Sequence, residues 1–245
     1  MTGGSALYTD PSLAGLYDSR NPWGADFDFC VKAAENARSV LDLGCGTGML
    51  AASLAKTHDV TGVDPAGPML DIARARPGGD RVTWVTGDAR SLDLRRSFDL
   101  IVMTGHAFQT LLTDSDIAAA LTTIADHLAP AGRFLFDSRN PAATDLTRWG
   151  PDHSHSTREH PDLGPIERYS TYSQDGEIVH YVEHYTVRAT GARFSGGDSL
   201  RFAPKPTLDR LLSEAGLTSE PCFGDWTGAP WTPQAADMVF HGGHA

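Results

Sequence analysis

The sequence predicts an α/β fold with a mostly parallel sheet, and three observations support this prediction. Apolar runs of five or six residues alternate with helical stretches from residue 25 to 137. Such alternation is typical of repeated β-α units with helices on both faces of a sheet. Glycines at alternate positions follow the first apolar run, and 245 residues suffice for one such domain with a sizeable core. We therefore expect a single domain over residues 1–245.

The first predicted strand runs into a glycine-rich loop. Val40–Gly48 reads Val-Leu-Asp-Leu-Gly-Cys-Gly-Thr-Gly, and a helix is predicted over Thr47–Lys56. Glycines allow a sharp turn and a close approach of backbone to a ligand. A dinucleotide motif would have its third glycine at position 49, which is Met49. Asp42 would favour an ammonium group over a pyrophosphate. The loop predicts a cofactor that is cationic at this end, and a dinucleotide-dependent oxidoreductase remains as an alternative.

The next elements continue the alternation of strands and helices. Strands are predicted at Asp59–Asp64, Val82–Thr86, Phe98–Met103 and Gly132–Asp137, and helices at Met69–Arg74 and Asp116–Leu128. Asp114 and Ser115 form the expected N-cap of the second helix. Asp64 ends its strand about twenty residues after the first glycine, where an acid can accept hydrogen bonds from both ribose hydroxyls.

The pattern changes after residue 140. Pro, Gly, Asp and His accumulate up to residue 165, and Ile166–Phe202 then becomes strand-like, with a hairpin turn signal at Ser173–Glu177. We expect an antiparallel insertion over 141–205 that forms a lid or a dimer surface. A helix at Pro206–Gly216 and strands at Leu217–Phe223 and Ala236–His241 follow.

Val40–Gly48 resembles the first motif of class I S-adenosylmethionine-dependent methyltransferases at every position. Asp64 is similar to the ribose-binding acid of that family, and Gly87-Asp88-Ala89 resembles its G-D-A motif, whose aspartate accepts from the adenine amino group. The resemblance covers residues 38 to 138. It implies a Rossmann-like, seven-stranded, mostly parallel sheet with a reversed terminal hairpin. It also implies an acceptor-binding insertion between strands five and six.

The resemblance further implies S-adenosyl-L-methionine as the cofactor and S-adenosyl-L-homocysteine as the product. The domain divides accordingly into an N-terminal helical cap (1–37), a cofactor-binding core (38–140), the insertion (141–205) and a C-terminal segment that completes the sheet (206–245). The expected cofactor-binding residues are Tyr17, Asp42, Gly44, Cys45, Gly46, Gly48, Asp64, Pro65, Met69, Gly87, Asp88, Ala89, Met103 and Thr104. Among these, Cys45 is expected to pack rather than act as a nucleophile.

Two aromatic residues near the N-terminus lie in a segment that related enzymes close over the cofactor. Tyr17 and Trp23 are candidates for a cation-π contact with the sulfonium. The alternative is that both only anchor the N-terminal helix to the core.

His106 is the expected catalytic residue. It follows the fourth strand, where ligands of open α/β sheets lie, and imidazole titrates in the range useful to a base. A hydrogen bond to a neighbouring loop or to the cofactor's carboxylate is the alternative role. Acceptor contacts are predicted for Trp23, His106, Arg139, Asn140, Tyr181 and Trp226. For Arg139 and Asn140 the alternative is a surface turn before Pro141, and for Trp226 it is loop packing.

Composition narrows the function. A net charge of −11 argues against nucleic acid as a partner. Three scattered cysteines suit a reducing compartment, and the absence of a leader-like or membrane-spanning apolar run favours a cytoplasmic protein. His153, His155 and His160 cluster, but without cysteine partners they do not predict a metal site. His180 and His184 would lie about 13 Å apart on a strand, too far for one ion.

The predicted activity is therefore methyl transfer to N or O of a small-molecule acceptor in natural-product biosynthesis. A planar heterocyclic or phenolic metabolite would suit the aromatic residues. Positioning two reactants can contribute about 7–11 kcal/mol, so a general base is not obligatory. We expect a monomer or homodimer without a membrane partner. A catalytically silent S-adenosylmethionine-binding regulatory protein is the remaining alternative.

Overall fold

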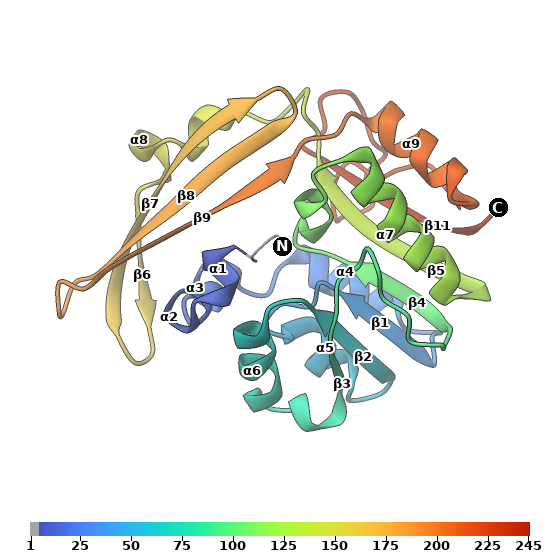
Figure 1. Ribbon diagram of the computed structural model, residues 1–245, viewed down its shortest axis with the longest axis horizontal. Coiled ribbons are helices and arrows are strands. Elements are labelled where there is room, and N and C mark those ends of the chain that lie inside the picture. The colour runs from blue at the N-terminus through green and yellow to red at the C-terminus, as the bar shows by residue number, and fades with distance from the viewer. Residues whose placement is uncertain (1–4) are drawn as a thin grey trace.

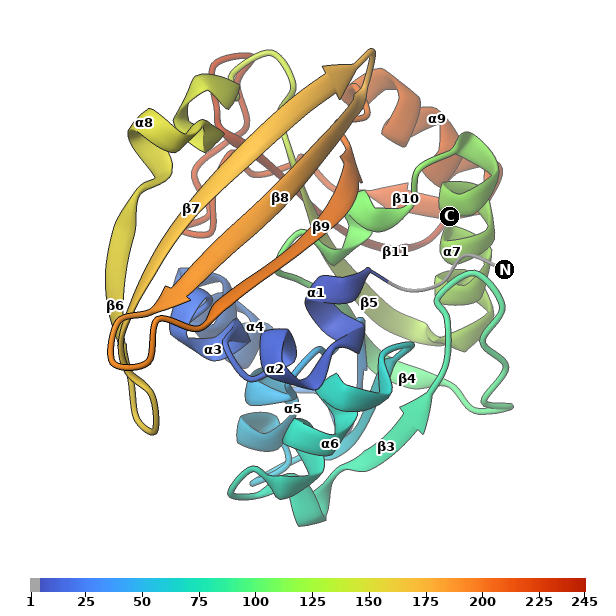
Figure 2. The same cartoon turned by 60° about the vertical axis from the view of Figure 1, so that its left-hand side comes forward.

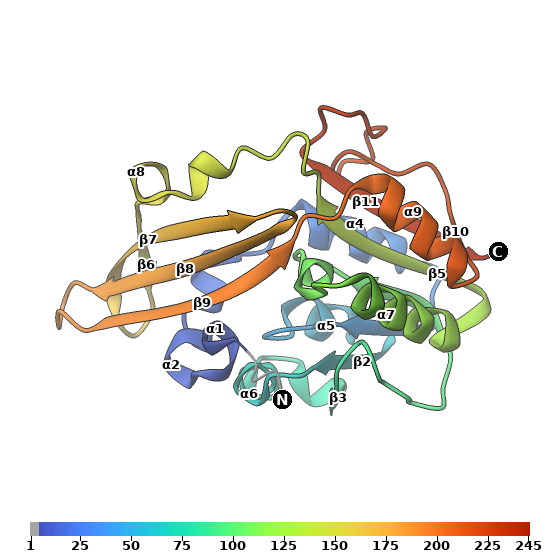
Figure 3. The same cartoon turned by 45° about the horizontal axis from the view of Figure 1, so that its top comes forward.

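The chain forms two β-sheets with the N-terminal helices beneath the smaller one (Figure 1). A computed structural model describes residues 5–245. The larger sheet has the strand order β10-β11-β5-β4-β1-β2-β3, and the smaller sheet has the order β6-β7-β8-β9. Figures 2 and 3 show the smaller sheet projecting from the core above α1 and α2. The first four residues of the expected N-terminal cap lie outside the described residues.

The larger sheet confirms the predicted topology. Its strands are β1 (Ser39–Leu43), β2 (Asp59–Asp64), β3 (Thr83–Thr86), β4 (Phe98–Met103), β5 (Leu128–Arg139), β10 (Leu217–Ser219) and β11 (Asp237–His244). The first five pair in parallel, whereas β11 is antiparallel to both β5 and β10. This is a seven-stranded sheet with a reversed terminal hairpin. The fifth strand begins four residues earlier than predicted, because Leu128 already pairs with Phe98.

The helices that cover the sheet are α4 (Ala25–Ala33), α5 (Met49–Leu54), α6 (Gly67–Ala75), α7 (Asp114–His127) and α9 (Lys205–Glu214). Single turns form α1 (Ala6–Thr9), α2 (Pro11–Ala14), α3 (Tyr17–Arg20), α8 (Pro151–Ser154) and the 3₁₀ segments η1 (Gly79–Arg81), η2 (Ala107–Thr110) and η3 (Leu146–Trp149). The N-cap of α7 is Thr113, not the predicted Asp114 or Ser115. The Thr113 hydroxyl accepts from the Asp116 N–H in a capping box.

Stacked aromatic rings position the segment that follows β4. Phe108 in η2 stacks on Phe136 of β5 with ring centroids 4.1 Å apart, and Phe136 stacks on Phe240 of β11 at 5.0 Å. All three side chains are buried. Such pairs add roughly 0.5–1.5 kcal/mol beyond the burial of their area. They hold η2, and with it the preceding His106, against the carboxyl ends of the strands.

The insertion between β5 and β10 is antiparallel, as predicted. It consists of β6 (Ser156–His160), β7 (Gly164–Asp175), β8 (Ile178–Val187) and β9 (Arg193–Arg201). Val179, Tyr181, Tyr185 and Val187 of β8 are buried on one face, and Leu7, Leu13 and Leu16 pack in the same cluster. The smaller sheet is therefore held to the core through the N-terminal helices.

Candidate active site

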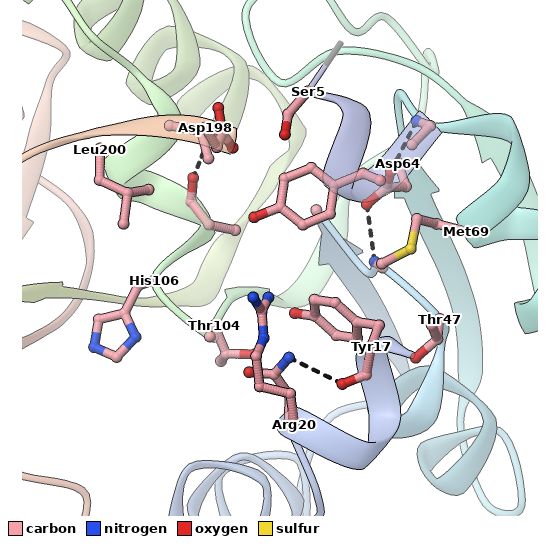
Figure 4. A pocket seen from close by; sticks show the side chains of 18 of the residues that line it. Ser5, Tyr17, Arg20, Thr47, Asp64, Met69, Thr104, His106, Asp198 and Leu200 are labelled. Atoms are coloured by element: carbon pink, nitrogen blue, oxygen red, sulfur yellow. Dashed lines mark hydrogen bonds between the residues drawn. The ribbon is translucent and has the colours of Figure 1, made fainter. Parts of the chain in front are cut away.

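A cavity of about 1460 Å³ lies beyond the carboxyl ends of β1, β2, β4 and β5. The N-terminal helices and the smaller sheet form its other walls. The strand order reverses between β1 and β4, and ligands of open α/β sheets bind at such a point. Figure 4 shows side chains from distant parts of the chain, among them Tyr17, Arg20, Asp64, His106 and Asp198, arranged around this space.

The glycine loop forms one wall of the cavity. Gly44 has φ +77°, and a Cβ there would lie 3.0 Å from the Ala107 Cβ. Gly48, in contrast, is not part of the cavity wall. It has φ +72°, and a Cβ on it would lie 2.3 Å from the Trp84 ring. The structure gives no support to the predicted cofactor contact of Gly48, and shows instead that this glycine allows α5 to pack against β3.

Asp64 is fixed at the end of β2. Its Oδ2 accepts from the Gly46 N–H at 2.9 Å and its Oδ1 from the Ala66 N–H at 2.8 Å. Burial raises its pKa. The neighbouring Pro65 and Met69 also line the cavity. The carboxylate is thus held in one orientation and keeps free lone pairs that can accept from hydroxyls.

Asp42 is buried beside the loop without a cation. Its residue is 2% exposed, and no ion pair joins it to any of residues 5–245. Burial, with a smaller contribution from the charge of Asp64, raises its pKa to about 7. A cationic ligand group would relieve the cost of ionising this carboxyl.

The α3 helix lies over the glycine loop. The Tyr17 ring is 3.8 Å from the position that a Gly46 Cβ would occupy, and its hydroxyl is 4.0 Å from that of Gly105. The adjacent Asp18 accepts from the Thr47 hydroxyl at 2.6 Å and pairs with Arg76. These contacts fasten Tyr17 above the space beside the loop.

Trp23 does not line the cavity. The residue is 40% exposed, and its indole donates to Asp28 Oδ1 at 2.7 Å and packs edge-on against Phe27. Trp23 therefore anchors the start of α4, as in the alternative given above, and the structure gives no support to its predicted contacts with cofactor and acceptor.

Asp88 lines the cavity with Gly87 and Ala89. Both of its carboxylate oxygens accept from the Arg90 guanidinium, at 2.9 and 2.5 Å, and this pairing lowers the pKa of Asp88. Arg90 also donates to Asp116 Oδ1 at 3.1 Å. Sequence reasoning identified Asp88 but missed Arg90, which keeps it ionised and oriented.

His106 lies between two carboxylates. Its Nε2 is 3.2 Å from Asp137 Oδ2 and 3.3 Å from Asp237 Oδ1, and its backbone N–H donates to Asp137 Oδ1 at 3.1 Å. The contact with Asp137 Oδ2 is not a hydrogen bond. That oxygen is buried and has no hydrogen-bond partner among residues 5–245. Burial raises the pKa of Asp137. The backbone at His106 is left-handed, with φ +61°.

Sequence reasoning missed both partners of His106. Asp137 carried a signal, since it ends the fifth predicted strand as Asp64 ends the second. Asp237 carried no such signal, because it lies at the beginning of its strand, whereas site residues were expected at the ends of strands. Asp26 of α4 and Arg20 of α3 also line the cavity and were not predicted.

Arg139, Tyr181 and Trp226 line the cavity, but Asn140 does not. The Asn140 Nδ2 donates to the carbonyls of Pro233 and Ala235 at 3.0 and 2.8 Å. Its Oδ1 accepts from the Ala142 N–H at 3.1 Å. The structure gives no support to the predicted substrate contact of Asn140, because its amide ties the end of β5 to the loop before β11.

Three further observations concern the Cys45 thiol, metal binding and membrane-spanning helices. Burial raises the pKa of the Cys45 thiol well above its ordinary value, which leaves it a poor nucleophile. Within residues 5–245, no group of three His, Cys, Asp or Glu side chains is arranged to hold a metal ion. Over the same residues, no helix combines the length and the apolar character needed to cross a membrane.

Comparison with known proteins shows the family. Residues 40–132 match the model of a methyltransferase domain. A dTDP-3-amino-3,6-dideoxy-alpha-D-glucopyranose N,N-dimethyltransferase from Streptomyces fradiae is 30% identical over 240 residues, covering 89% of each chain. The chain belongs to the class I S-adenosylmethionine-dependent methyltransferases.

A second relative supports this conclusion, and a solved structure shows the same fold. A cypemycin N-terminal methyltransferase from a Streptomyces species is 28% identical over 207 residues, covering 83% of this methyltransferase and 82% of the relative. The structure of an S-adenosylmethionine-dependent methyltransferase from Clostridium acetobutylicum has the same fold, with a TM-score of 0.81 at 18% identity and coverage of 96% and 98%. The protein is an enzyme that uses S-adenosyl-L-methionine, and the oxidoreductase and silent-binder alternatives are excluded.

The residues present in the methyltransferase fit this cofactor. A carboxylate with free lone pairs ends β2, a buried acid without a cation lies beside the loop, and positive φ angles at Gly44 and Gly46 let the backbone turn toward the cavity. The carboxylate at the end of β2 suits the ribose, and the buried acid suits the ammonium group. The turned backbone at the two glycines leaves room for the ligand to approach closely.

Proposed function

We propose that this methyltransferase methylates an amine nitrogen of a small-molecule acceptor, with His106 as the residue that takes the proton. The observation that carries the proposal is the position of the His106 imidazole, between Asp137 and Asp237 in the cavity wall beside Thr104. Residues 38–140 would bind the cofactor, the insertion over 141–205 would contribute the acceptor side, and residues 206–245 would complete the sheet.

Cofactor binding is assigned to residues around the glycine loop. When bound, S-adenosyl-L-methionine supplies an electrophilic methyl group with a thioether as leaving group. Asp64 would accept from the ribose hydroxyls, Asp88 from the adenine amino group, and Asp42 would face the ammonium group. Arg20 lies 5.6 Å over the Tyr17 ring and would bind the carboxylate. The contacts of Met103 and Thr104 would come from their backbone groups.

Three carboxylates make the reaction end of the cavity favourable for a cation. Asp26, Asp137 and Asp237 surround His106, and the charge of His106 acts on the pKa of both Asp26 and Asp137. An acceptor amine enters protonated at neutral pH and has no lone pair until that proton leaves. His106 takes the proton, and the adjacent carboxylates stabilise the resulting imidazolium. Such a base typically contributes about 10²–10⁴-fold.

The relatives also favour nitrogen. Both relatives described above are named as methyltransferases that act at an N-terminus or an amino sugar nitrogen. The charged lining of the cavity suits an amine better than the planar heterocyclic or phenolic acceptor suggested by the aromatic residues. A role in natural-product biosynthesis remains part of this proposal.

The test uses methyl-labelled cofactor and a panel of amines and phenols, with products identified by mass spectrometry. We expect N-methylated products, and His106→Ala should lower kcat by about 10²–10⁴-fold without changing S-adenosylhomocysteine affinity. His180→Ala is the matched control, because His180 is exposed on β8 and bonds Ser199 at 2.7 Å. Methylation of phenols but not amines, or full activity of His106→Ala, would contradict the proposal.

A further inference from the structure

We infer that the acceptor carries an oxyanion, a carboxylate or a phosphate, and that Arg139 binds it. This inference rests on the proposed function of the same cavity, because it concerns the group that orients the amine. It adds a recognition residue and a chemical class of substrate to the reaction assigned to His106.

Arg139 is a half-buried cation that pairs directly with no carboxylate of the described residues. It is the last residue of β5 and lines the cavity. Within residues 5–245, no carboxylate lies within 4.0 Å of its guanidinium. Burial lowers its pKa, which reflects the cost of keeping this charge away from water. The charges of Asp137 and Asp237 partly offset this cost, but neither carboxylate pairs directly with the guanidinium, so its charge stays costly until a ligand or a side chain pairs with it.

The guanidinium is held in a fixed position. Its Nη1 donates to Gln109 Oε1 at 2.9 Å, and its Cζ lies 5.1 Å from the centre of the Trp149 ring. Gln109 is itself 1% exposed and donates to the Arg201 carbonyl at 2.9 Å. No hydrogen bond joins Nε or Nη2 of Arg139 to any described residue. These two donors form an edge of the guanidinium that can bind a carboxylate or phosphate in a bidentate manner.

Three other arginines of the same cavity are paired with carboxylates, whereas Arg148 and Arg158, which have no such pair among the described residues, are exposed to water. Arg168 donates to both oxygens of Glu183 at 2.6 and 2.9 Å, and Arg20 lies 3.4 Å from the same carboxylate. Arg90 is paired with Asp88. The chain carries a net charge of −11, so the missing partner of Arg139 does not reflect a shortage of acids.

The position of Arg139 also limits the shape of the acceptor. Asp137 and Arg139 are two residues apart on β5, so their side chains leave the same face about 7 Å apart. Asp137 contacts His106, where the amine would lose its proton. One wall therefore presents charges of opposite sign close together. A small molecule with an amine and an acid group a few bonds apart complements this wall.

The test measures anion binding directly. Protein saturated with S-adenosylhomocysteine is titrated calorimetrically with sodium acetate and, separately, with sodium phosphate in chloride-free buffer. We expect saturable binding, and the tighter of the two anions identifies the group as carboxylate or phosphate. Arg139→Met should weaken that binding at least tenfold. Arg158→Gln, an exposed arginine that also lines the cavity, is the control and should leave it within twofold.

Two results would overturn the inference. One is equal anion affinity in wild type and Arg139→Met, or no saturable binding of either anion. The other is a tenfold loss of S-adenosylhomocysteine affinity in Arg139→Met without loss of anion binding, which would assign Arg139 to the cofactor's carboxylate. Arg139→Lys keeps the charge but not the planar fork, and its expected partial loss provides the test if Arg139→Met does not fold.

The same experiments separate this inference from the proposed function. Methyl transfer to an amine that carries a carboxylate or phosphate, at the same rate in wild type and Arg139→Met, would overturn the anion site and leave the N-methyl transfer intact. Anion binding that depends on Arg139, in a protein that methylates phenols and no amines, would support the anion site and overturn the proposed function.

Discussion

The pKa of Asp42 predicts that cofactor affinity depends on pH. In the free protein, burial raises this pKa to about 7, so Asp42 is mostly protonated below neutral pH. An ammonium group beside the carboxylate favours the ionised form and lowers the pKa by about 1–3 units. Binding below pH 7 must therefore release a proton, and affinity should increase as the pH rises toward 7.

The size of the effect follows from linkage. If the complex has a pKa 1–3 units below that of the free protein, affinity should rise between roughly fivefold and fiftyfold from pH 5 to pH 7. The assay is calorimetric titration with S-adenosylhomocysteine over this range, in buffers with different ionisation heats to count released protons. The ligand's own amino group stays protonated there.

Asp42→Asn should bind the ligand more weakly and lose this dependence on pH. Asp71→Asn, on the exposed face of α6, is the control and should keep it. Asp64 also has a raised pKa, so only the comparison with Asp42→Asn assigns the slope to one residue. A pH-independent affinity in the wild-type protein, or an equal slope in Asp42→Asn, would refute the reasoning.

Three further predictions concern the stability of the protein and the α3 segment over the glycine loop. Because its folded pKa is raised, Asp42 should make the ligand-free protein less stable as pH rises from about 4 through 7, by up to about 1.4 kcal/mol per unit, and Asp42→Asn should flatten this trend in urea denaturation. Gly48→Ala should lower the free energy of unfolding by about 1–3 kcal/mol more than Gly176→Ala does in the same denaturation assay. Both glycines have a positive φ, but only Gly48 faces the ring of Trp84. Equal losses in the two variants would contradict this reading. Asp18→Asn should weaken S-adenosylhomocysteine binding several-fold with little loss of Tm, because the contact of Asp18 with Thr47 holds α3 and its Tyr17 over the glycine loop; unchanged affinity would show that ligand binding does not depend on this contact.

The sequence predicted the parts of the structure that depend on local patterns. The strands Asp59–Asp64 and Phe98–Met103 have the predicted bounds, because each is a short apolar run between polar turns. The glycine motif identified the loop around Gly44 because it, too, is a local pattern of residues. It could not separate Gly48 from the others, because a ligand approach and a close helix packing both require glycine. Only the position of Trp84 on the neighbouring strand decides between them.

Asn140 and Arg139 show a second limit. Both follow the predicted fifth strand, and the sequence predicted an acceptor contact for each of them. The carbonyls that satisfy Asn140 belong to Pro233 and Ala235, which are far away in the sequence. Arg139 finds only Gln109 and a tryptophan face. Whether a polar side chain is satisfied by the protein or left to a ligand depends on long-range neighbours, which periodicity and spacing do not reveal.

Asp237 shows why the partners of His106 were missed. Residues that follow parallel strands share one edge of the sheet, and this rule pointed to His106. Strand β11 runs in the opposite direction, so its first residue, and not its last, reaches that edge, where Asp237 pairs in register with Arg139. The reversed strand thereby places an acid beside His106, which follows β4, and in register with Arg139 at the end of β5, although no ion pair joins the two side chains. The first residue of a reversed strand is therefore a candidate site residue in this architecture, on the same physical grounds as the last residues of the parallel strands.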